Sequence, residues 1–170
     1  ANATGSDLIL VEALGVFASH DVFETNLVHK LAHSKTPEAR AYAARVLGQF
    51  ADSFGRSSRR EEAPASNSKP ETRNSKFDQS LLTSAATELL ALLAADPHPR
   101  VRLEAIVACS YLPTANAIEI AAIATDQPMD AGLEYAFTQC VHALKPHWQD
   151  AQARGELKFP AMNVNDSVTK

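Results

Sequence analysis

The sequence is poor in aromatic residues, in cysteine and in glycine, and each shortage disfavours a class of protein. Aromatic residues make up only 6% of the 170 residues, which disfavours β-sheets because strands prefer aromatic and β-branched side chains. Two cysteines are too few for a disulfide framework, and their spacing matches no zinc motif. Six glycines form no phosphate-binding loop. Alanine and leucine carry most of the apolar weight instead, and this favours closely packed helices.

Clustered basic residues and long apolar runs are scarce as well. The net charge of −4 and the pI near 5.8 argue against nucleic acid as a partner, because phosphate binding needs clustered lysine and arginine. No window holds 18 consecutive apolar residues, so we expect no membrane insertion. Because the sequence shows neither a signal peptide nor an initiator methionine, we expect it to be a segment of a longer protein.

What the sequence does contain is a local pattern that returns about every 30 residues. An alanine stands in the same setting in VEALGV, AYAARV and LEAIVA, as Ala13, Ala43 and Ala105, and Tyr135 takes its place in LEYAFT. The first and last intervals are 30 residues and the middle one is 62, which equals two periods or one period plus an insertion. Self-similarity at a fixed period is typical of solenoid proteins.

Apolar periodicity and turn residues predict a series of helices joined by short turns. The expected helices cover residues 7–19, 22–33, 37–51, 78–95, 99–111, 115–125 and 129–144, with a short helix over 147–154. Asp7, Asp21 and Thr114 are the expected N-caps, and Pro146 is expected to stop the helix before it. One antiparallel hairpin cannot bury its own apolar face, so the predicted fold is all-α, an α–α superhelix of stacked hairpins.

The composition changes sharply between residues 52 and 77. This stretch is rich in serine, asparagine, proline and charged residues, and it cannot bury enough surface to offset chain entropy. We predict a mobile insertion in a repeat domain that spans residues 7–154. With six basic and four acidic residues the insertion could dock an acidic partner, although a solvated surface loop is the simpler interpretation. Residues 1–6 are predicted to be a disordered N-terminus, and 155–170 an extended tail.

Two segments resemble HEAT repeats, the unit of an armadillo-like solenoid. In DPHPRVRLEAIVA, residues 96–108, Asp96 and Arg102 correspond to the turn aspartate and the helix arginine that recur in that family, with Ala105 at the helix contact. In TPEARAYAARVL, residues 36–47, Arg40 corresponds to Arg102, but Ser34 replaces the aspartate.

A third copy at residues 126–138 keeps Asp126 and has Gly132 in the arginine position. Only one repeat therefore holds the complete pair, and a continuous ladder of aspartate and arginine is not expected. Asp96 is expected to accept backbone N–H bonds at the helix start and to meet Arg102 or the arginine of a neighbouring repeat.

A longer stretch, DQPMDAGLEYAFTQCVHALKPHW at residues 126–148, resembles the heme-binding CxxCH proteins of planctomycetes and verrucomicrobia, described as membrane-bound dehydrogenases. In that family a dehydrogenase-like propeller is followed by HEAT repeats and a cytochrome-like domain. The resemblance implies that this chain is the HEAT segment of an exported, periplasmic redox protein. It carries no catalytic residue over, because this sequence lacks both the C-x-x-C-H motif and the propeller. The segment itself is then expected to hold no cofactor.

Histidine and cysteine pairs are the other candidates for a site. His29 and His33 lie four residues apart, the spacing of a two-histidine metal site, but no third ligand is evident. His142 and His147 beside Trp148 could ligate heme, although a structural helix end with a packing tryptophan is the simpler interpretation. Cys109 and Cys140 should be buried free thiols unless their helices approach closely enough for a disulfide.

The sequence therefore favours a non-catalytic scaffold that binds a protein partner or the neighbouring domains of a parent chain. A metal-binding or heme-binding helical module that uses the histidine pairs is the alternative. A third hypothesis is a phycobilin lyase of the HEAT type, which no local motif supports.

Overall fold

The chain was analysed as a computed structural model that describes residues 5–59 and 75–157, with side chains described for 5–51 and 84–157. The described residues form eight α-helices and one 3-10 turn, and no strand lies among them, which confirms the all-α prediction. The elements are α1 (Gly5–Ser19), α2 (Thr25–Ala32), α3 (Pro37–Arg59), α4 (Ser75–Ala94), α5 (Pro99–Ser110), α6 (Asn116–Ile123), η1 (Ala124–Asp126), α7 (Ala131–Ala143) and α8 (Lys145–Ala153).

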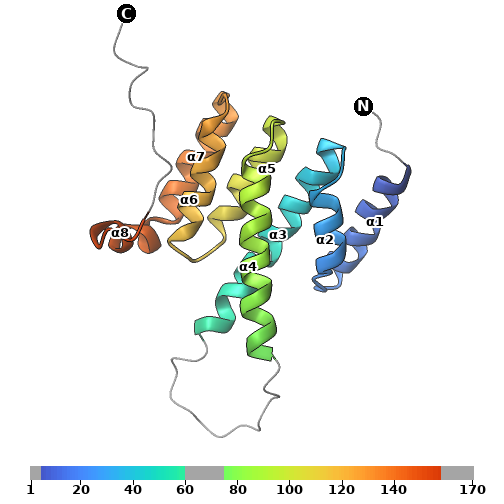
Figure 1. Cartoon of the computed structure of the whole chain (residues 1–170), viewed down its shortest axis with the longest axis horizontal. Helices are drawn as coiled ribbons and strands as arrows, with labels where there is room; N and C mark the ends of the chain where they lie inside the picture. Colours follow the sequence, from blue (N-terminus) through green and yellow to red (C-terminus); the bar gives the residue numbers. More distant parts are fainter. Residues whose placement is uncertain (1–4, 60–74, 158–170) are drawn as a thin grey trace, which may run out of the picture.

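The helices follow one another in chain order along the long axis of the molecule (Figure 1). Helices α1, α3, α5 and α7 pack successively in one layer, and α2, α4 and α6 pack in a second layer against them. The contact of α3 with α5 is the most extensive one. Since these two helices are direct neighbours, the interval of 62 residues between Ala43 and Ala105 is one period plus an insertion.

Alanine and leucine build the core between the two layers, as the composition suggested. Ala43 in α3 and Ala105 in α5 are fully buried, and Ala13 in α1 is half-buried. The small side chains allow close helix contact, and the tightest approach lies one turn further along α3. A Cβ atom added to Gly48 would stand 2.8 Å from the Cα of Ala108. Glycine at this position is what lets the two backbones meet.

Replacing Gly48 by valine is therefore expected to destabilise the fold by about 2 kcal/mol, because overpacking a closed contact forces backbone shifts. The measurement is the free energy of unfolding from urea denaturation. Gly5→Val is the matched control, since nothing lies within 4 Å of a Cβ at Gly5. Equal stabilities of the two variants would contradict the close approach of α3 and α5.

The fourth copy of the repeat is shifted by one residue from the predicted register. Tyr135 stands 68% exposed, so it cannot occupy the buried position of Ala105. Ala136 packs against the core instead, and Cys140 is fully buried as Cys109 is. These pairs lie 31 residues apart, and the expected spacing of 30 was wrong for α7.

The predicted N-caps also need correction. Asp7 lies inside α1, which begins at Gly5, and Asp21 lies in the connection before α2, where it adopts a positive φ of 56°. The residue before α6 is Ala115 rather than Thr114, and it makes no side-chain cap. Pro146 stands in the first turn of α8, where a missing N–H costs nothing, so it opens a helix as well as ending one.

The predicted boundaries of the insertion and of the termini change as well. Helix α3 continues to Arg59 and α4 begins at Ser75, so both edges of the predicted insertion at 52–77 are helical. Gly5 and Ser6, predicted to be disordered, belong to α1. Residues 155–157 lie beyond α8, and Leu157 packs against the core. The rest of the predicted insertion, N-terminus and tail lies outside the described residues. Within the described part of the chain, no helix has the length and apolar character needed to cross a membrane.

Candidate functional site

A row of hydrogen bonds joins the turns at one end of the helices and connects successive repeats. It consists of Asp7, Ser34, Arg40, Asp96, Arg102 and Pro128, and we call it the turn ladder. Its first step joins α1 to the following turn, because the Ser34 hydroxyl donates to the Asp7 carboxylate at 2.7 Å. Ser34 Oγ also accepts the Thr36 N–H at 3.0 Å. Ser34 therefore does for its turn what Asp96 does for the next one, where Asp96 Oδ1 accepts the His98 N–H at 2.8 Å.

Arg40 makes the second step of the turn ladder. It donates to the Ser34 carbonyl at 2.9 Å within its own repeat, and to both carboxylate oxygens of Asp96 at 2.6 and 3.0 Å in the next. Asp96 is buried, so this bidentate pair is largely shielded from water. The hydrogen bond to Asp96 raises the pKa of Arg40, and it is the largest cause of that rise. Of the two expected partners of Asp96, the arginine of the neighbouring repeat is the one that the carboxylate meets.

Arg102 makes the third step with carbonyl oxygens in place of a carboxylate. It donates to the backbone of Asp96 at 3.0 Å and of Pro97 at 3.1 Å, and then to Pro128 of the following turn at 2.6 Å. Its side chain is buried, and its Nε–H has no acceptor among the described residues. The ladder is thus continuous although its acceptors change. Asp126, expected to be its next aspartate, is exposed at the end of η1, and Asp130 caps α7 by accepting the Leu133 N–H at 2.8 Å.

The histidine candidates lie on exposed or structural positions. His29 and His33 stand at the end of α2 with ring centroids 4.4 Å apart, as their spacing predicts. His33 Nδ1 lies 2.9 Å from the His29 carbonyl. In the described part of the chain, no group of three histidine, cysteine, aspartate or glutamate residues could hold a metal. Trp148 packs against the core and donates its indole N–H to the Val141 carbonyl at 2.9 Å, which fastens α8 to α7.

The two cysteines are buried free thiols, which confirms the expectation for them. Burial raises the pKa of Cys140 to about 12, and burial, with a smaller contribution from Cys140, raises the pKa of Cys109 further. Thiol chemistry needs the thiolate, so neither side chain can act as a nucleophile near neutral pH.

Both thiols are accordingly expected to react with a disulfide reagent such as DTNB only after unfolding. At about pH 8 the native protein should release no thionitrobenzoate over minutes, whereas the urea-unfolded chain should release two equivalents. Rapid reaction of either thiol in the native protein would contradict the packing of α5 against α7.

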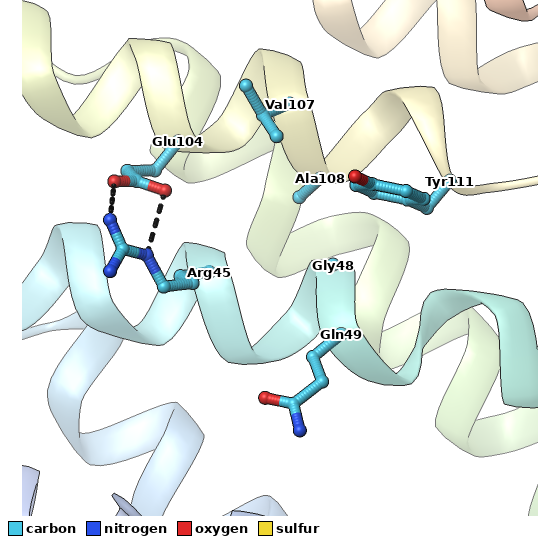
Figure 2. Close-up of a pocket in the computed structure, with 7 residues that line it drawn as sticks. All are labelled: Arg45, Gly48, Gln49, Glu104, Val107, Ala108 and Tyr111. Carbon is cyan, nitrogen blue, oxygen red and sulfur yellow. Dashed lines mark hydrogen bonds and ion pairs between the residues drawn. The ribbon is translucent and has the colours of Figure 1, made fainter.

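The most open surface feature lies on the outer side of the α3, α5 and α7 layer. One hollow of about 530 Å³ runs between α3 and α5, and Figure 2 shows the residues that line it. A second hollow of about 640 Å³ runs between α5 and α7. Glu104, Val107 and Tyr111 of α5 line both hollows. We call the two hollows together the α5 groove.

Apolar and aromatic side chains dominate the α5 groove. Val107 is 40% exposed, Tyr111 57% and Tyr135 68%. Tyrosine combines a large contact area with a hydroxyl and is enriched at protein interfaces. Neutral hydrogen-bonding groups complete the lining, with the Gln49 amide in the first hollow and the Gln139 amide in the second. The arrangement suits a peptide segment, which brings apolar side chains together with backbone N–H and C=O groups.

One ion pair crosses the α5 groove. Arg45 of α3 donates to Glu104 of α5 through two bonds of 3.2 and 2.5 Å (Figure 2). This hydrogen bonding raises the pKa of Arg45. Because the Arg45 side chain is 58% exposed, water screens the pair, and it is worth at most about 1 kcal/mol.

Most residues of the α5 groove could not be identified from the sequence. The pattern marked Glu104 only as part of a solvated face, and it placed Tyr135 at a helix contact. The exposure of Val107 and Tyr111 is a property of three stacked helices, so no local motif announces it. Comparison of the chain with protein-family models, with curated proteins and with solved structures gave no match in any of the three.

Proposed function

We propose that this chain is a non-catalytic scaffold that binds a protein segment in the α5 groove. The observation that carries the proposal is the exposure of Val107, Tyr111 and Tyr135 along one continuous surface. Exposed apolar patches with a polar rim are typical of interaction sites. The surface belongs to helices that are anchored by the core and by the turn ladder, so a partner meets it with little loss of conformational entropy.

The wider setting of the chain belongs to the same proposal. We infer that the hairpins are HEAT-like units of an α–α superhelix, and the two layers and the turn ladder support this inference. The resemblance to heme-binding CxxCH proteins makes the segment part of an exported dehydrogenase-like parent. Reading the coding sequence downstream tests that part. A C-x-x-C-H motif is expected there, and its absence would leave a scaffold without a redox parent.

A peptide selection tests the binding function directly. A phage library displaying random peptides of about 12 residues, roughly 40 Å long when extended, is selected on the folded chain. Enriched peptides are then measured on Val107→Arg and on Leu92→Arg by fluorescence anisotropy. Leu92 is the matched control because it is an apolar residue of α4, 46% exposed, in the other layer.

Binding is expected to fall at least tenfold in Val107→Arg and to stay within twofold of the parent chain in Leu92→Arg. Both variants change exposed positions, so both should fold, and circular dichroism checks this. If no peptide is enriched, or if the peptides bind Val107→Arg as well as the parent chain, the α5 groove is not a binding site.

A further inference from the structure

The carboxylate of Glu104 occupies the centre of the α5 groove and is poorly exposed. It lines both hollows, and its side chain is only 14% exposed, whereas its partner Arg45 is 58% exposed. The two charges of the ion pair therefore differ in what they lose when the pair is broken. Arg45 can turn into water, but Glu104 would be left as a partly buried charge without a counterion.

This difference decides which charge a partner should carry. An acidic partner would take Arg45 and strand Glu104 among apolar side chains. A basic partner would take Glu104 and release Arg45 to solvent, where its charge is hydrated. The chain as a whole carries a net charge of −4, which also attracts a cationic segment.

The aromatic lining favours a cation at the same place. Tyr111 lines both hollows with Glu104, and Tyr135 lines the second hollow with it. The face of a tyrosine ring attracts the side chains of arginine and lysine. Val107, between the two hollows, offers apolar contact to the residues that flank the cation.

We propose that the α5 groove recognises a partner protein segment in which an arginine or lysine, flanked by apolar residues, replaces Arg45 on the carboxylate of Glu104. The inference rests on the proposed function and adds the chemistry of the partner to it. Arg45 then acts as an internal competitor that occupies the carboxylate until the partner arrives.

The test uses the peptides selected on the parent chain. Their affinities are measured on the parent chain, on Glu104→Gln and on Arg45→Met, together with peptide analogues in which the basic residue is replaced by glutamine. Glu104→Gln should weaken binding at least tenfold, and Arg45→Met should tighten it about threefold, since it removes the competitor. The glutamine analogues should bind weakly to all three chains, and their affinity should no longer depend on Glu104.

Two results would overturn the inference while leaving the proposed function intact. One is a set of groove-binding peptides, sensitive to Val107→Arg, that lack basic residues. The other is an affinity that Glu104→Gln leaves unchanged or that Arg45→Met lowers. Peptides insensitive to Val107→Arg would instead remove the proposed function, and the inference with it.

Discussion

Replacing Asp96 by alanine should lower the free energy of unfolding by about 3 kcal/mol, because it leaves the charge of Arg40 without its partner inside the structure. Arg40 now donates two bonds to the Asp96 carboxylate, and its side chain is only 16% exposed. The same substitution removes the acceptor of the His98 N–H at the start of α5. Urea denaturation followed by circular dichroism measures the loss.

Asp126→Ala is the matched control for this prediction. Asp126 is the aspartate that the sequence pattern places in the equivalent turn, but it is exposed in the structure. Its removal should change stability by less than about 0.5 kcal/mol. In the double variant Arg40→Ala, Asp96→Ala the two losses should not add, because each single change already breaks the same pair. Equal effects of Asp96→Ala and Asp126→Ala would contradict the turn ladder.

Replacing Ala105 by aspartate should unfold the chain at room temperature. Ala105 is fully buried on α5, the helix that packs against both α3 and α7, and no cation stands ready to pair with a new carboxylate there in the described structure. Burying an unpaired charge costs more than a domain of this size can supply. Far-UV circular dichroism should show loss of helix, and the thermal transition should disappear.

Two further aspartate substitutions grade this prediction. Ala13→Asp should be milder, because Ala13 is only half-buried. Tyr135→Asp should leave the melting temperature almost unchanged, because Tyr135 is exposed although the repeat pattern aligns it with Ala105. A melting temperature for Ala105→Asp within a degree or two of the parent chain would refute the packing of α5. A large loss in Tyr135→Asp would refute the corrected register of α7.

The helices were predictable because their signals are local. Pro99 and the prolines of the preceding turn defined the start of α5, and the apolar spacing gave every helix to within a few residues at most ends. The caps were less predictable because the same residue types serve distant partners. Asp7 was expected to cap its own helix, but it accepts hydrogen bonds from Ser34 and Thr36, which only the folded chain brings near.

Features that depend on contact between helices escaped the sequence. Gly48 reads as an ordinary helix glycine until α5 lies against it, and nothing local distinguishes it from Gly15. A shift of one residue in the fourth repeat moved Tyr135 from an expected contact to the surface, because the turn before α7 is one residue longer than the period of 30 allows. The α5 groove has the same origin, since three helices contribute its lining.

The central claim is that the α3, α5 and α7 layer presents the binding surface, and hydrogen–deuterium exchange with a selected peptide tests it most directly. Bound peptide should slow exchange in segments of α3, α5 and α7 that include Arg45, Val107 and Tyr135, and it should leave α2 and α4 unchanged. Protection confined to α2 and α4, or no protection at saturating peptide, would show that the partner surface lies elsewhere.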